Sequence, residues 1–150
     1  MKLTALSTRL ASTSLLAIAG LHVNWATGST WPLPDRAALA DEVAGRADAD
    51  PPSAAACLVV AGLLTAAAGF VAGRPHGTPG LSRLGSAVVV TTLATRGGLG
   101  MAGRTDILAA GSVSERFKAR DRRVYSPLCL ALAALSLPAM GSTGSADSYT

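Results

Sequence analysis

Six polar or aromatic residues stand in or beside the long apolar stretches of this chain, and their types could support chemistry. They are His22, Asn24, Trp25, Arg96, Asp121 and Tyr125. An ionisable side chain inside an apolar segment is costly, so it usually faces a partner or a polar interior. Arg96 and Asp121 carry opposite charges. We therefore hypothesise that Arg96 pairs with Asp121, and that His22 or Tyr125 completes a hydrogen-bonded cluster.

Such a cluster has three interpretations. It is a structural clamp that fixes helix packing, or a ligand-binding or catalytic pocket, or Arg96 extends without a partner toward a polar interface. Trp25 and Trp31 also fit an aromatic belt at the level of lipid headgroups, which requires no substrate. These alternatives remain open from the sequence.

The composition indicates the medium that surrounds these residues. The chain has 150 residues, of which 49% are hydrophobic and 15% charged, with a mean hydropathy of +0.39. A soluble domain carries roughly 25% charged residues. A chain this short has too few polar groups to cover a water-exposed surface. The sequence therefore predicts an integral protein of the cell membrane, with the lipid bilayer as its partner.

The apolar stretches predict an all-α fold, a four-helix transmembrane bundle. The expected spans cover residues 3–26, 53–73, 81–103 and 124–140, and about 20 helical residues cross the hydrocarbon layer. Residues 1–140 form a single membrane domain, and the Gly- and Ser-rich residues 141–150 form a disordered tail. The first stretch has a rival interpretation as a cleaved signal peptide, with Lys2 and Arg9 before an apolar run and Ala17-Ile18-Ala19 as the cleavage site.

The connectors carry their own signals. Asp35 predicts the start of a short helix over residues 35–44. Residues 74–80 form a Pro- and Gly-rich turn. Ser112 and Glu115 fit a capping box, which places a helix start near Val113. That helix either lies on the headgroups or is a solvated charged helix. In the second span, Gly62, Ala66 and Gly69 form a small-residue stripe that allows a neighbouring helix to approach closely.

We call the membrane face where the first span ends side B. Spans two and four begin on side B and span three ends there, so all six singled-out residues fall in the side B half. Side A has four basic residues and side B has eight, which favours a cytoplasmic side B. The charges that flank the first span favour the opposite orientation. Six of the 13 basic residues lie in the connector before the fourth span, and this concentration favours contact with anionic headgroups over nucleic acid.

Several chemistries are excluded by motif and spacing. A haem site would need two axial histidines, and His76 lies on side A, about one membrane thickness from His22. The sequence has no HExxH, GxSxG or GxxxxGK[ST] phosphate loop. Cys57 and Cys129 lie in apolar runs without CxxC spacing and are predicted to pack as small hydrophobic residues. We predict no catalytic residue, metal or cofactor.

Three segments carry a resemblance to a known family. They are Leu21–Gly28 (LHVNWATG) with Trp31-Pro32, then Arg96-Gly97-Gly98, then Asp121–Cys129 (DRRVYSPLC). Together they resemble a bacterial family of small four-helix membrane proteins of unknown function, over roughly residues 5–137. The resemblance implies a membrane location and four spans, and no activity. Many members carry an Asp shortly after the Arg, where this chain has Gly100, so a role for that carboxylate is in doubt here.

Two function classes follow. The first is a non-enzymatic structural or accessory membrane subunit, whose partners beside the bilayer are other membrane proteins or a second copy. The alternative is a small-molecule binder, transporter component or membrane-embedded enzyme that uses the polar cluster. A pocket of about 300 Å³ or more lined by the cluster would favour the alternative. A dry and fully paired cluster would favour the first class.

Overall fold

The computed structural model describes residues 2–46, 50–73, 78–108 and 113–141. These residues form helices and no strand, so the all-α class is confirmed. The predicted disordered tail lies outside the described residues from residue 142 onward. Residues 74–77 of the predicted turn and Ser112 of the predicted capping box also lie outside them.

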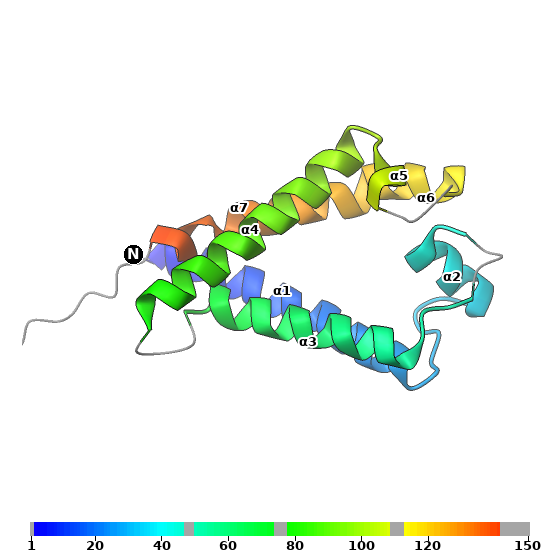
Figure 1. Ribbon diagram of the computed structural model, residues 1–150, viewed down its shortest axis with the longest axis horizontal. Coiled ribbons are helices and arrows are strands. Elements are labelled where there is room, and N and C mark those ends of the chain that lie inside the picture. Colours follow the sequence, from blue (N-terminus) through cyan, green and yellow to red (C-terminus); the bar gives the residue numbers. More distant parts are fainter. Residues whose placement is uncertain (1, 47–49, 74–77, 109–112, 142–150) are drawn as a thin grey trace, which may run out of the picture.

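The architecture rests on four long helices. They are α1 (Lys2–Ala26), α3 (Ala54–Val71), α4 (Pro79–Met101) and α7 (Ser126–Gly141). α1 packs mainly against α3, and α4 packs mainly against α7. Figure 1 shows that the two pairs meet near the start of α1 and diverge toward the other end of the molecule. That end, the predicted side B, holds the short helices α2 (Arg36–Ala44), α5 (Thr105–Leu108) and α6 (Glu115–Arg120).

Local signals account for most helix starts. Asp35 caps α2, since its carboxylate accepts the N–H of Ala38 at 2.8 Å, as the sequence predicted. α6 begins at Glu115 and is capped by Ser114, whose hydroxyl accepts the N–H of Phe117 at 3.0 Å. The predicted start near Val113 was therefore wrong by two residues. The Ser114 hydroxyl also donates to Asp41 Oδ1 at 2.7 Å, and this contact with α2 favours Ser114 as the cap.

The segment before the fourth predicted span does not form a separate element. The helix runs continuously over Glu115–Gly141, and its middle part, η1 (Asp121–Tyr125), is a π-helix. Pro127 explains the π turn, because proline lacks an N–H and its ring would clash with the carbonyl of Arg123 in an α-helix. A wider turn relieves that clash, and the Ser126 N–H donates to the carbonyl of Asp121 instead.

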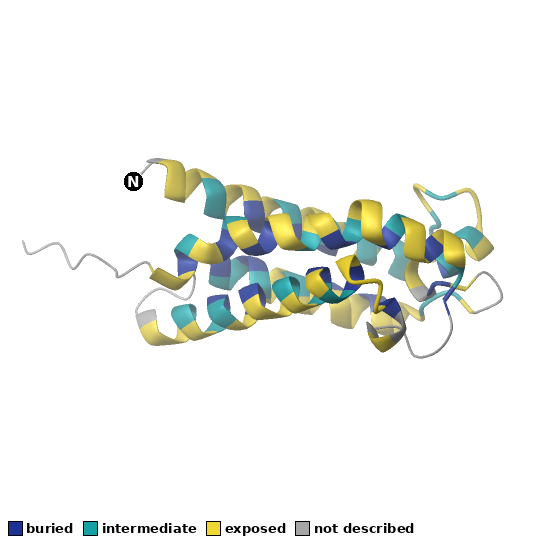
Figure 2. Cartoon of the chain, turned by 90° about the horizontal axis from the view of Figure 1, so that it is seen from above, coloured by how far each residue is buried: buried dark blue, intermediate teal, exposed yellow. Residues whose placement is uncertain are grey.

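The hydrophobic core lies where the two helix pairs meet. Its buried residues are Ala11, Leu15, Ala68, Val71, Val89, Leu132 and Ala139. Figure 2 shows buried residues between the helices and exposed ones along their outer faces. The predicted small-residue stripe does not pack within the chain, since Gly62 and Ala66 are exposed. The buried face of α3 carries Cys57 and Ala61 instead, because α1 packs on that face.

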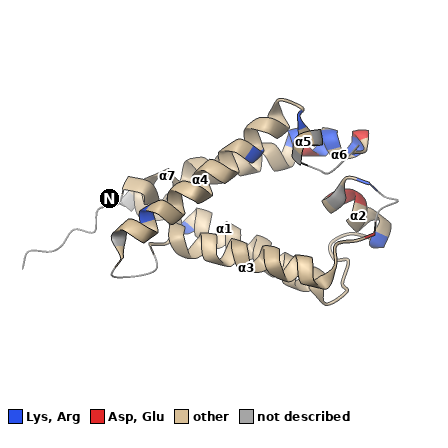
Figure 3. Ribbon diagram, in the orientation of Figure 1, with Lys and Arg blue, Asp and Glu red and all other residues tan. Residues whose placement is uncertain are grey.

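Two helices are long and apolar enough to cross a membrane by length and composition. They are α3 and the continuous helix Glu115–Gly141. α1 and α4 match them in length, but serine, threonine and arginine residues lower their hydropathy. Charged residues gather on α2 and α6, at the end of the molecule where the two helix pairs diverge, as Figure 3 shows. The long helices carry few charges between their ends.

Ser114 offers a test of the junction between α2 and α6. We expect Ser114→Ala to lower the free energy of unfolding by about 1–2 kcal/mol, because it removes a helix cap and the hydrogen bond to Asp41. Ser53→Ala is the matched control, since the Ser53 hydroxyl caps α3 through the N–H of Ala56 at 3.2 Å. Its loss should be about 0.5–1 kcal/mol. Denaturant titrations that give equal losses for both variants would contradict a role for the Asp41 contact.

Candidate functional site

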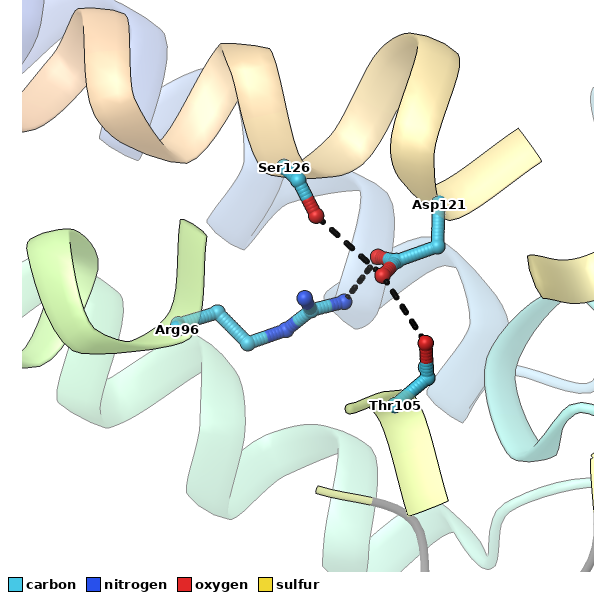
Figure 4. Close-up of polar contacts among 4 residues, drawn as sticks. All are labelled: Arg96, Thr105, Asp121 and Ser126. Atoms are coloured by element: carbon cyan, nitrogen blue, oxygen red, sulfur yellow. Dashed lines mark hydrogen bonds and ion pairs between the residues drawn. The ribbon is translucent and has the colours of Figure 1, made fainter. Parts of the chain in front are cut away.

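An ion pair between α4 and η1 forms the centre of the candidate site. Arg96 Nη2 donates to Asp121 Oδ1 at 2.5 Å. The Asp121 side chain is 0% exposed and that of Arg96 is 28% exposed. Figure 4 shows the guanidinium extending from α4 to the carboxylate. The geometry thus contains the pairing that the sequence led us to hypothesise.

Two hydroxyls, rather than His22 or Tyr125, complete the coordination of the carboxylate. Ser126 Oγ donates to Asp121 Oδ2 at 3.1 Å, and Thr105 Oγ1 donates to the same oxygen at 3.5 Å. Residues five apart on an α-helix point about 140° away from each other. The π turn closes over five residues and brings Ser126 onto the face of Asp121. The irregular helix is therefore what assembles this half of the site.

Two glycines of α4 allow the close approach of η1 and α7. A Cβ atom at Gly97 would lie 2.7 Å from Leu130 Cγ and 2.8 Å from the carbonyl oxygen of Ser126. A Cβ atom at Gly100 would collide with Ser126 Oγ and Asp121 Oδ2 and lie 2.9 Å from Arg96 Nη1. Both positions need the smallest side chain, because Leu130 and the Ser126 backbone lie against Gly97 and the polar cluster lies against Gly100.

One nitrogen of the cluster stays without a partner. Arg96 Nη1 is buried and has no hydrogen-bond partner among the described residues. A buried donor without an acceptor costs free energy, so it marks a place for a water or a ligand oxygen. The described cluster therefore falls short of the fully paired arrangement that would favour a purely structural role.

The other singled-out residues form a separate group at the end of α1. Nδ1 of His22 donates to the carbonyl of Ile18 at 2.9 Å, and its ring lies 4.9 Å from the ring of Trp25, centroid to centroid. Trp25 Nε1 donates to the carbonyl of Trp31 at 2.9 Å, and Asn24 Nδ2 donates to Ser29 Oγ at 3.0 Å. These residues hold the loop that follows α1.

In the described part of the chain, neither His22 nor Tyr125 completes the cluster around Arg96 and Asp121 as hypothesised. Among the described residues, no hydrogen bond joins the group on α1 to Arg96 or Asp121. Tyr125 packs its ring 6.4 Å from the ring of Phe117. A common depth places residues in one layer, but the two helix pairs diverge at this end (Figure 1), which separates α1 from α4.

Sequence reasoning missed the contacts between α2 and α6. Arg120 Nη1 forms an ion pair with Glu42 Oε2, and the Ser114 N–H donates to the carbonyl of Gly45 at 2.7 Å. Gly45 ends α2 with φ 74°, and a Cβ atom there would lie 2.7 Å from Val113 Cγ1. The available signal was the acidic character of one connector and the basic character of the other.

Comparison with known protein families gives one match to this chain. Residues 15–136 match the model of a family described as a protein of unknown function (DUF3995). The chain belongs to this family. The resemblance to a family of unknown function is thereby confirmed, whereas the match carries no statement on membrane location. No curated protein and no solved structure matches the chain.

In this DUF3995 member, the pockets with walls made of described residues include three of several hundred Å³. One of about 390 Å³ lies between α2 and α6, one of about 360 Å³ lies beside Thr105, and one of about 470 Å³ lies at the opposite end of the bundle. None of these three has Arg96 or Asp121 in its wall. In the described part of the chain, no group of three or more His, Cys, Asp or Glu residues could hold a metal ion.

Proposed function

We propose that this chain is a multi-pass membrane protein in which α1, α3, α4 and the Glu115–Gly141 helix each cross the bilayer. The observation that carries the proposal is the exposure of its apolar helices. Only 22% of α3 is buried inside the molecule, and Val59 and Leu63 are 62% and 67% exposed. A core helix of a soluble protein is mostly buried. Exposure of this apolar surface to water would cost a free energy of about 25 cal/mol per Å². Contact with lipid chains avoids that cost.

The contacts and exposed side chains of the two less apolar helices, α1 and α4, also support a membrane crossing. α1 contributes Ala11 and Leu15 to the core, and Ser12 Oγ of α1 donates to the carbonyl of Ala68 in α3 at 2.5 Å. Small residues and serine hydroxyls are typical contacts between membrane helices. α4 lies along α7 and carries Leu84 and Val88 on its exposed surface. These contacts support a retained α1 over a cleaved signal peptide.

Within this bundle the Arg96–Asp121 pair acts as a structural clamp, and the chain serves as a non-enzymatic structural or accessory subunit. The pair joins α4 to the start of the last helix, and the full burial of the Asp121 side chain makes the carboxylate dependent on its partners. The three pockets described above open elsewhere. Both facts support a packing role over a role in substrate binding.

A binding function is the second candidate, favoured by one observation. Arg96 Nη1 has no hydrogen-bond partner within the described ranges, and a carboxylate or other anionic oxygen of a ligand could accept its N–H. The chain would then be a small-molecule binder, transporter component or membrane-embedded enzyme. Arg96→Lys distinguishes the two roles. If the pair is a clamp, the shorter cation should cost only a modest part of the stability. If the guanidinium binds a ligand, the variant should fold but lose ligand binding, because an ammonium group does not reproduce the guanidinium geometry.

Cysteine labelling of intact membranes tests whether α3 and α4 both cross the bilayer. In a background without native cysteines, we expect Asp35→Cys and Arg116→Cys to react with an impermeant reagent from one side, and Ala72→Cys from the other. If only the two most apolar helices crossed the bilayer, Ala72→Cys and Arg116→Cys would share a side. An alkaline wash of the membranes provides the control, because an inserted chain resists this extraction. A purified chain that stays monodisperse in buffer without detergent would refute membrane insertion altogether.

A further inference from the structure

We propose that the pocket beside Thr105 binds the phosphodiester headgroup of an anionic phospholipid. This proposal rests on the proposed function, since it needs side B to lie at the membrane surface. The pocket has a volume of about 360 Å³, and its wall consists of Gly103, Thr105, Glu115, Lys118, Ala119 and Arg122. It starts two residues after the end of α4 at Met101, the depth at which headgroups would lie.

The charges of the wall favour an anion. Lys118 and Arg122 are four residues apart on one continuous helix, so they share a face. Among the described wall residues, Glu115 is the acidic one, and its carboxylate lies 2.7 Å from Lys118 Nζ. Its side chain is 88% exposed, and an exposed ion pair of this kind contributes little. A phosphate oxygen can therefore replace Glu115 at the ammonium group.

The other wall residues define the shape of the site. A Cβ atom at Gly103 would lie 2.7 Å from Arg122 Nη2, so the missing side chain lets the guanidinium rest against the end of α4. The Thr105 hydroxyl donates to Asp121, and Thr105 is buried. The ligand would thus meet two cations and a rigid floor that the Arg96–Asp121 cluster holds in place. The planar guanidinium of Arg122 suits a bidentate contact with phosphate.

Arg123 provides a matched control for general attraction between a basic segment and an acidic membrane. It follows Arg122 directly and is exposed, yet it is absent from the wall of this pocket. Both residues carry one positive charge near the same surface. A diffuse electrostatic effect would treat them alike, whereas a defined pocket would distinguish them.

The experiment titrates the full chain, purified in a neutral detergent, with phosphatidylglycerol, phosphatidylcholine or inorganic phosphate, and follows the thermal unfolding midpoint and lipid-bound species by native mass spectrometry. We expect phosphatidylglycerol alone to raise the midpoint. Lys118→Gln and Arg122→Gln should each weaken its apparent affinity about 5-fold, and Arg123→Gln by less than about 2-fold. Glu115→Gln should strengthen it, because the competing carboxylate is gone.

Each contrary result is decisive. Equal losses for Arg122→Gln and Arg123→Gln, or equal effects of phosphatidylglycerol and phosphatidylcholine, would overturn the pocket. An effect of inorganic phosphate without any effect of lipid would replace the lipid by a soluble ligand. Arg122→Lys keeps the charge but not the bidentate geometry, so it should lose less affinity than Arg122→Gln. This partial rescue would exclude misfolding as the cause of the loss in Arg122→Gln. Failure here in a chain that passes the topology test leaves the membrane proposal intact.

Discussion

Asp121→Ala should lower the free energy of unfolding by about 3 kcal/mol, the largest loss that we expect from a single substitution. The change leaves the Arg96 guanidinium without its carboxylate and removes the acceptor of the Ser126 and Thr105 hydroxyls. Breaking a buried ion pair from one side typically costs about 3–5 kcal/mol. The partial exposure of Arg96 places the expected value at the lower end. Denaturant titration in detergent measures it.

Two further variants show whether the loss comes from an unpaired charge. Arg96→Met combined with Asp121→Leu removes both charges and should cost less than Asp121→Ala alone, because no buried ion then lacks a partner. Glu42→Gln breaks the ion pair with Arg120, in which both side chains are partly exposed. It should cost under about 1 kcal/mol. A loss for Asp121→Ala no larger than for Glu42→Gln would remove the basis for a clamp.

Gly100→Ala should destabilise the fold by about 1–3 kcal/mol, although alanine is the better helix former. The new methyl group would collide with Ser126 Oγ and Asp121 Oδ2. The carboxylate cannot withdraw without lengthening its contact with Arg96. Helix α4 would have to move away from η1, which also loosens the close approach at Gly97. Thermal and chemical unfolding of the purified variant measure the effect.

Gly98→Ala is the matched control in the same turn of α4. A Cβ atom at Gly98 has no heavy atom within 4 Å, and the residue is exposed. This variant should be neutral or more stable by up to about 1 kcal/mol, as expected for alanine in a helix. Adding Ser126→Ala to Gly100→Ala should restore part of the loss, because it removes one of the two colliding atoms. Equal stabilities of Gly98→Ala and Gly100→Ala would mean that α4 and η1 are not closely packed.

The partners of the ion pair could be predicted because charged residues are scarce in and beside the apolar stretches. Arg96 is the one charged residue deep inside an apolar stretch, and Asp121 is an acid that opens the next such stretch on the same side. The cost of a lone charge in an apolar environment makes their association the economical arrangement. The surrounding hydroxyls could not be predicted in this way. Serine and threonine are common throughout the chain, and nothing in their spacing distinguishes Ser126 or Thr105.

The π turn explains why the register of the last helix against α4 could not be predicted from the sequence. An α-helical projection places Ser126 away from Asp121, so the sequence pattern argues against the contact that the structure contains. Pro127 indicates an irregularity, but it does not say whether the helix breaks, kinks or widens. The tertiary structure gives the answer, because Gly97 and Gly100 leave room for the last helix to approach α4 closely and place Asp121 beside Arg96.

By itself the sequence determined the all-helical class, the approximate extents of the long helices, the Asp35 cap and the identity of the two charges that must meet. These properties depend on local propensity and on hydrophobic content, which are readable residue by residue. Only the tertiary structure decided which face of α3 is buried, that Ser114 caps α6, and that His22, Asn24 and Trp25 stay apart from Arg96. These properties depend on the divergence of two helix pairs, because contacts between helices are set by their relative placement and not by depth along any one of them.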